Sequence, residues 1–111
     1  MLERALFLAV AIPTAVVAAQ GPDATAQPDA PRREVLMHRL LHDCGSCHGM
    51  TMKGGLGPPL LPDALADKDS EGLAGIVLEG VPGTPMPPWK TELTQEEALW
   101  LVERLKQGLT P

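Results

Sequence analysis

Apolar residues recur at helical spacing in three stretches of the chain, and no stretch alternates as a strand would. The clearest is the last, LTQEEALWLVERLKQG. Thr94 stands at the expected N-cap with Glu97 three residues later, which is the capping-box pattern, and Gly108 is expected to end the helix. The residues expected on its buried face are Ala98, Leu101, Val102 and Leu105. The pattern as a whole predicts an all-α domain.

Two further helices are predicted upstream. REVLMHRLLHD has Leu36 and Leu40 at helical spacing between charged residues, so we expect a helix over about residues 33–47. SEGLAGIVLEG predicts a shorter helix that Ser70 caps and Gly80 ends. Between the helices lie GMTMKGGLGPPLLPD and VPGTPMPPW, whose glycines and prolines predict wrapped, stiff loops.

The N-terminal residues have the pattern of a secretory signal. We expect residues 1–19 to be cleaved after Ala19, which implies export across the inner membrane to the periplasm and no stable membrane insertion afterwards. The apolar run, about 14 residues long and broken by Pro13, is shorter than the roughly 20 residues that a retained anchor needs. Residues 20–31 contain no large apolar side chain and are expected to form a disordered lead-in to a folded domain over residues 32–109.

The folded domain is poor in aromatic residues and acidic. Once Phe7 leaves with the signal, Trp89 and Trp100 are the only Phe, Trp or Tyr side chains left. A domain this small is marginal without an additional stabilising element, so we expect a non-protein group to fill part of its core. The 14 acidic residues outnumber the 9 basic ones, and no long basic cluster occurs. This argues against nucleic acid and anionic lipid as partners.

The stretch DCGSCHG carries the candidate chemistry. A CxxC pair can be a redox dithiol, half of a zinc site or, with a following histidine, the attachment point of a c-type haem. Dithiol chemistry normally uses a thioredoxin-like framework, and a structural zinc needs two more ligands. The sequence pattern favours neither a redox dithiol nor a zinc site. The haem interpretation uses all three residues. Cys44 and Cys47 would form thioethers with the haem vinyl groups, and His48 would be the proximal iron ligand.

A second iron ligand must come from a distant segment. Met86 lies well beyond His48 in TPMPP, where flanking prolines fix the backbone. The methionines expected to pack rather than to bind are Met37, Met50 and Met52. His38 and His42, one helical turn apart, are expected to be solvated; His42 would compete for the iron only if Met86 were lost.

The ordered set CGSCH, GGLGPPL and GTPMPPW, followed by a capped C-terminal helix, resembles the class I c-type cytochromes. These motifs are similar to those of the small mono-haem cytochromes c encoded with the dissimilatory nitrite reductase of denitrifying bacteria. The resemblance implies three main helices and Gly/Pro-rich loops wrapped around one covalent haem c. It implies that the Pro58 carbonyl accepts the His48 ring N–H and that Leu60 lines the haem. The helix crossing would be formed by Leu36, Leu40, Leu101 and Leu105.

Two positions depart from the family pattern, since Leu40 and Arg104 stand where aromatic residues are common. The crossing of the first and last helices could therefore be looser than usual.

The resemblance also implies a function. With two protein ligands the iron has no open position, so we expect a single-electron carrier and not an enzyme. The expected partners are redox proteins, either nitrite reductase as electron acceptor or, as the alternative, the proteins that mature its d-type haem. A CxxC thiol redox protein is kept as a further alternative. Only Lys53 and Lys90 lie in the two loops, so docking through Leu56 and Pro87 in a small, apolar, transient interface is expected. Trp89 is expected either to join this interface or to pack on the haem as a lid.

Overall fold

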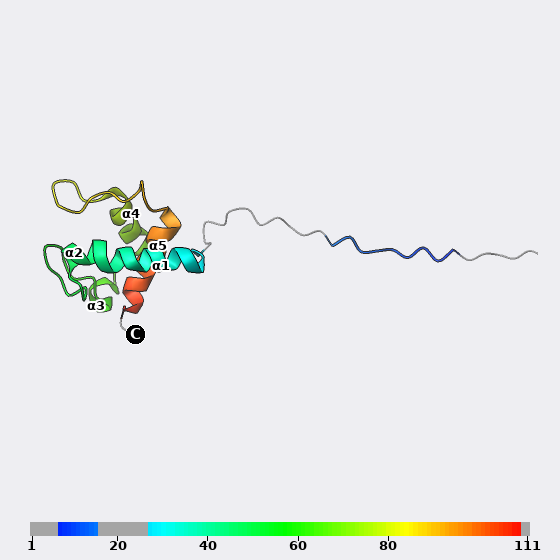
Figure 1. The fold of residues 1–111 in the computed structure, drawn as a ribbon, viewed down its shortest axis with the longest axis horizontal. Coiled ribbons are helices and arrows are strands. Elements are labelled where there is room, and N and C mark those ends of the chain that lie inside the picture. Colours follow the sequence, from blue (N-terminus) through cyan, green and yellow to red (C-terminus); the bar gives the residue numbers. More distant parts are fainter. Residues whose placement is uncertain (1–6, 16–26, 110–111) are drawn as a thin grey trace, which may run out of the picture.

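The computed structural model describes residues 7–15 and 27–109, and helices are its only regular secondary structure there. Figure 1 shows the helices gathered around the crossing of the first and last ones. The elements are α1 (Ala30–Arg39), the π-helical turn η1 (Leu40–Cys44), α2 (Gly45–His48), α3 (Pro62–Leu65), α4 (Ser70–Glu79) and α5 (Gln95–Gln107). The all-α prediction is confirmed.

The first helical segment runs without interruption through α1, η1 and α2, and is longer at both ends than the predicted 33–47. It begins at Ala30 because the Asp29 side chain accepts a hydrogen bond from Arg32 N at 2.9 Å and Pro31 occupies the first turn. The lead-in predicted for residues 20–31 was therefore wrong at its end.

The caps of α4 and α5 follow from short side-chain contacts. In α5 the predicted capping box is confirmed: Thr94 Oγ1 accepts from Glu97 N at 3.1 Å, and Glu97 Oε1 accepts from Thr94 N at 3.0 Å. The N-cap of α4 is Asp69, one residue before the predicted Ser70. An aspartate caps at least as well as a serine, and its Oδ2 accepts from Gly72 N at 2.8 Å.

The long loop after α2 contains an element that the pattern did not predict. Pro62–Leu65 forms the single turn α3, and Pro62 suits its first position because the missing N–H is not needed there. The turn places Leu65 in the core, with 4% of its surface exposed. The prediction of an uninterrupted loop was therefore wrong at its end.

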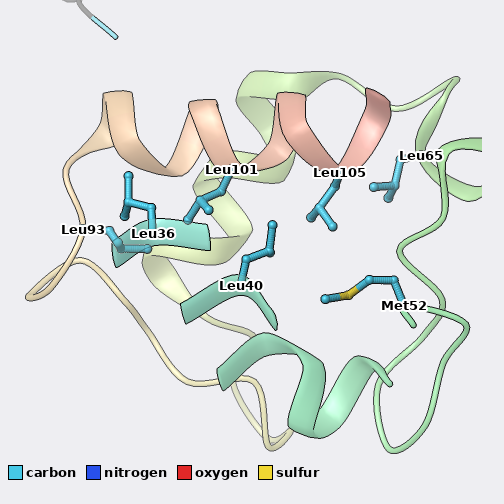
Figure 2. Packing of buried hydrophobic residues seen from close by; sticks show 7 residues of the cluster. All are labelled: Leu36, Leu40, Met52, Leu65, Leu93, Leu101 and Leu105. Carbon is cyan, nitrogen blue, oxygen red and sulfur yellow. The ribbon is translucent and has the colours of Figure 1, made fainter. Parts of the chain in front are cut away.

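The core is one aliphatic cluster between the first and last helices. Figure 2 shows Leu101 and Leu105 pointing from α5 toward Leu40, with Met52 and Leu65 beside them. The cluster consists of Leu36, Leu40, Met52, Leu65, Leu93, Leu101 and Leu105. All four residues predicted for the helix crossing belong to it. Burial of each leucine side chain contributes about 1.5–3 kcal/mol.

A second, smaller cluster joins α4 to α5. It contains Ala74, Ala98 and Val102. The buried residues of α5 are thus the four that its pattern predicted.

Two ion pairs supplement the packing of the first helical segment against α5 and the segment before it. Arg32 near the start of α1 donates to Glu97 of α5, and Arg39 donates to Glu92 in the segment before α5. Leu40 is 1% exposed, so its smaller side chain still fills its site. These two ion pairs, one to α5 and one to the segment before it, oppose the predicted looseness.

Residues 7–15 form no helix or strand and are exposed. The predicted cleavage after Ala19 lies outside the described residues. Within the described ranges no helix has the length and apolar character required to cross a membrane.

Candidate functional site

The two cysteines and the adjoining histidine lie at the end of the first helical segment. Cys44 is the last residue of η1, while Cys47 and His48 belong to α2, which ends at Gly49 with a φ of 92°. Cys44 and Cys47 are not joined in a disulfide and are half-buried, and Cys44 packs against the aliphatic core. The helix therefore presents two thiols and an imidazole in close succession beside apolar side chains.

The chemical state of Cys44 argues against a redox dithiol. Burial raises the pKa of the Cys44 thiol to about 11, and the neighbouring Asp43 carboxylate adds to the rise. At neutral pH this thiol is protonated, whereas thiol exchange needs a thiolate. An apolar, uncharged thiol instead suits a site that receives an apolar group.

The imidazole of His48 is held by the loop that follows it. Nδ1 of His48 lies 2.8 Å from the carbonyl oxygen of Pro58. A carbonyl can only accept, so Nδ1 carries the proton in this contact and Nε2 keeps its lone pair. His48 is thus oriented with one nitrogen available to a metal, as histidine ligands with such a partner generally are.

The same loop packs tightly on the ring and on the end of α2. A Cβ atom at Gly57 would lie 2.7 Å from Cε1 and 2.8 Å from Nδ1 of His48, so only glycine fits there. Gly57 N donates to Cys47 O at 2.8 Å, and Gly54 N donates to His48 O at 2.8 Å. Sequence reasoning identified Pro58 but missed Gly57.

Leu60, predicted to line the haem, is half-buried and packs against the aliphatic core. Its amide donates to Met52 O at 2.9 Å, which closes the loop. Both Leu60 and Cys44 thus contact the same cluster.

Met86 lies in the second loop, which folds back onto the end of α4. Met86 O accepts from Val81 N at 3.1 Å, and Met86 N donates to Thr84 Oγ1 at 3.3 Å. A Cβ atom at Gly80 would lie 2.7–2.8 Å from the backbone of residues 86–88. The backbone of Met86 is therefore fixed on both sides.

Farther along this loop, Trp89 N donates to Val77 O at 3.1 Å and Lys90 N donates to Leu78 O at 3.2 Å. We call the segment 81–90, with these bonds to α4, the methionine strap. In Figure 1 the strap, in yellow, and the loop after α2, in green, reach toward the same end of the molecule.

The site residues thus form two groups. His48 and Pro58 are joined directly by a hydrogen bond, and Cys44 and Leu60 share the core. Met86 is half-buried on the separate strap and belongs to neither of the core clusters found in the described part of the chain.

The donor set fits a covalent haem and not a bare metal ion. Two thiols precede an imidazole with a free Nε2, and a half-buried thioether stands on the opposite loop. In residues 7–15 and 27–109 no group of three or more His, Cys, Asp or Glu side chains could hold a metal ion. The structural zinc interpretation therefore loses its support.

The other residues named in the sequence analysis differ in how far they are buried. Met52 is buried in the core and Met37 packs on it, but Met50 is 58% exposed, so its predicted packing was wrong. Trp89 is half-buried and packs against the core, while Leu56 is 75% exposed. Leu56 is therefore more available than Trp89 for docking.

Comparison with known proteins identifies the family. A family model described as "Cytochrome C oxidase, cbb3-type, subunit III" matches residues 28–103. Cytochrome c55X of Pseudomonas aeruginosa is 56% identical over 81 residues, which are 73% of this chain and 68% of that protein. The chain belongs to the c-type cytochromes. It therefore carries covalently bound haem c.

Further relatives extend the similarity to nearly the whole cytochrome. Cytochrome c55X of Paracoccus denitrificans is 45% identical over 105 residues, or 95% of this chain and 94% of that one. The solved structure of "c-type cytochrome NirC" is 55% identical, with a TM-score of 0.70, and covers 72% of this chain and 94% of its own. The predicted resemblance to c-type cytochromes of nitrite reductase systems is confirmed.

A second solved structure, "Dihydro-heme d1 dehydrogenase NirN in complex with DHE", is 32% identical with a TM-score of 0.58. It matches 74% of this cytochrome but only 17% of that chain, so the similarity concerns one part of a larger protein.

Proposed function

We propose that this cytochrome is a periplasmic mono-haem carrier that delivers single electrons to dissimilatory nitrite reductase in denitrification. The observation that carries the proposal is the hydrogen bond from His48 Nδ1 to Pro58 O, which leaves Nε2 free on an oriented ring. The electron-carrier role has support from the kinship with cytochrome c55X and NirC.

Each site residue has a separate task in this proposal. Cys44 and Cys47 would hold the haem through thioethers, and His48 Nε2 and Met86 Sδ would bind its iron. The haem iron supplies the one-electron step between its ferric and ferrous states. Pro58 keeps the imidazole in one tautomer and raises its basicity.

The two ligands are held by backbone contacts rather than by long side chains. The loop after α2 fixes the His48 ring through Pro58 and Gly57, and the strap fixes Met86 through hydrogen bonds to both its N–H and its carbonyl. Ligands held this firmly move little when the charge on the iron changes. If His48 and Met86 both bind the iron, no position would be left for a substrate, which is the arrangement expected of an electron carrier.

The partner surface follows from what the two loops expose. Leu56 is 75% exposed and Pro87 is exposed on the strap. Lys90 is engaged with Glu79 at 3.2 Å, so exposed Lys53 is the lysine of these two loops that remains for steering. We therefore propose a small, apolar and short-lived interface with nitrite reductase.

A second candidate is a role in maturation of the d-type haem of that reductase. The similarity to part of the dihydro-heme d1 dehydrogenase structure favours it, because a segment of that protein resembles this cytochrome at 32% identity. In that role the cytochrome would accept electrons or bind a maturation protein. A thiol redox function is opposed by the raised pKa of Cys44.

Absorption spectra of oxidised holoprotein test the ligand assignment. The wild type should show a sulfur-to-iron charge-transfer band that Met86→Ala loses and the matched control Met50→Ala keeps, because Met50 is exposed. A band that survives in Met86→Ala would refute the axial methionine.

The partner is tested separately. Rapid oxidation of the reduced cytochrome by purified nitrite reductase supports the donor role. A deletion strain with normal nitrite reductase protein but defective d-type haem supports maturation instead.

A further inference from the structure

Two imidazoles lie together on the exposed side of the first helical segment. His38 belongs to α1 and His42 to η1, and both side chains are exposed. Their ring centroids are 4.3 Å apart, with an angle of 38° between the ring planes. The helix thus brings two imidazole rings, each with nitrogen donors, side by side in water.

This separation is close to that of a chelating pair. A metal ion binds imidazole nitrogen at about 2 Å, so two rings on adjacent coordination positions have centroids about 4 to 5 Å apart. Histidines four residues apart on one helix face are a known way to bind such ions. Small rotations of the exposed side chains suffice to aim one nitrogen of each ring at a common point.

The surroundings favour a cation. The full sequence has three histidines, and the third, His48, is bound to Pro58 at the haem site. Exposed Asp43 follows His42 directly in the sequence, and the nearby cation Arg39 pairs with Glu92. The formal net charge of −5 also favours the binding of a cation.

We propose that His38 and His42 chelate one divalent transition-metal ion, with Cu²⁺ bound more tightly than Ni²⁺ or Zn²⁺. The order follows from the general preference of imidazole sites along the first transition series. No third side-chain ligand joins the pair among the described residues, so water completes the coordination. The site is therefore open and exchangeable, unlike a four-ligand structural zinc site.

Calorimetric titration of CuCl₂ into untagged, oxidised holoprotein tests the site. The wild type should bind one ion, and His38→Ala or His42→Ala should each weaken binding about 10²- to 10⁴-fold, as expected when one arm of a two-point attachment is removed. The double variant gives the background of the rest of the chain.

Glu34→Ala, one turn before His38, is the matched control and should keep the wild-type affinity. The haem spectrum and circular dichroism of every variant should be unchanged, because the substituted side chains are exposed. Wild-type affinity in either histidine variant, or an equal loss in Glu34→Ala, would overturn the proposal.

Discussion

Gly80 is the position where one added methyl group should disturb the methionine strap most. A Cβ atom there would lie 2.7 Å from Pro87 C, 2.7 Å from Pro88 N and 2.8 Å from Met86 O. All three are backbone atoms, so no side chain can rotate away. Because non-bonded carbon atoms prefer about 3.5–4.0 Å, the strap must move by roughly 1 Å in Gly80→Ala.

The backbone conformation of Gly80 adds to this cost. Its φ of 68° and ψ of −174° lie in a region that residues with a Cβ hardly occupy, which costs on the order of 1–3 kcal/mol. We therefore expect Gly80→Ala to unfold at lower denaturant concentration. It should also lose part of the sulfur-to-iron charge-transfer band, because the displaced strap carries Met86.

Gly83→Ala is the matched control on the same strap. Gly83 also has a positive φ, 79°, but a Cβ there would meet no atom within 4 Å. It should therefore show backbone strain without displacement of Met86, and keep the band and the reduction potential. The reasoning is refuted if Gly80→Ala keeps the full charge-transfer band. If Met86→Ala itself left the band intact, the ligand assignment would fail, and not the account of the strap.

Three further substitutions test other parts of the structure. Gly57→Ala should shift the reduction potential of the holoprotein, because the new methyl would push the imidazole of His48, the proposed proximal ligand, away from its carbonyl acceptor; an unchanged potential, equal to that of the control Gly75→Ala, would contradict this. Glu97→Gln should flatten the acid side of a plot of Tm against pH. The guanidinium that donates to Glu97 lowers the folded-state pKa of its carboxyl, so the stabilisation is complete above the ordinary carboxyl pKa of about 4.3 and is lost as pH falls through the lower folded value; parallel curves for variant and wild type would argue otherwise. Leu36→Ala should cost about 2–5 kcal/mol in urea unfolding because this leucine is fully buried, whereas the half-exposed neighbour changed in Val35→Ala should cost far less; equal losses would contradict the placement of the core.

The features predicted correctly from the sequence are those that interactions between neighbouring residues determine. Helix α5 was predicted with its cap, its end and its buried face because Thr94, Glu97 and Gly108 act within a few residues of one another. The errors at the other helix starts have the same local character. Asp69 and Ser70 are both competent caps, and only the chain geometry selects the first.

The contacts that hold the site could not be predicted in this way. Gly57 meets the ring of His48, and Gly80 meets the backbone of residues 86–88, each across a turn of the chain. The sequence alone does not distinguish a glycine that is required because a Cβ atom would clash from one that is required for the conformation of a turn. The π-helical turn at Leu40–Cys44 likewise has no pattern of its own, because its residues fit an α-helix equally well.

The two loops that carry the proposed ligands' contacts, the loop after α2 and the methionine strap, are held in the same way, and this bears on the proposed electron transfer. Each is fastened to the end of a helix by backbone hydrogen bonds and a glycine that allows close approach: the first at α2 through Gly57, the second at α4 through Gly80. Because backbone contacts hold both loops, their outward side chains are not needed to hold them in place. Apolar residues such as Leu56 and Pro87 can then remain exposed for a partner while the ligands stay fixed. A domain with an aliphatic core and few aromatic residues can in this way combine a rigid haem site with a surface adapted to brief contacts.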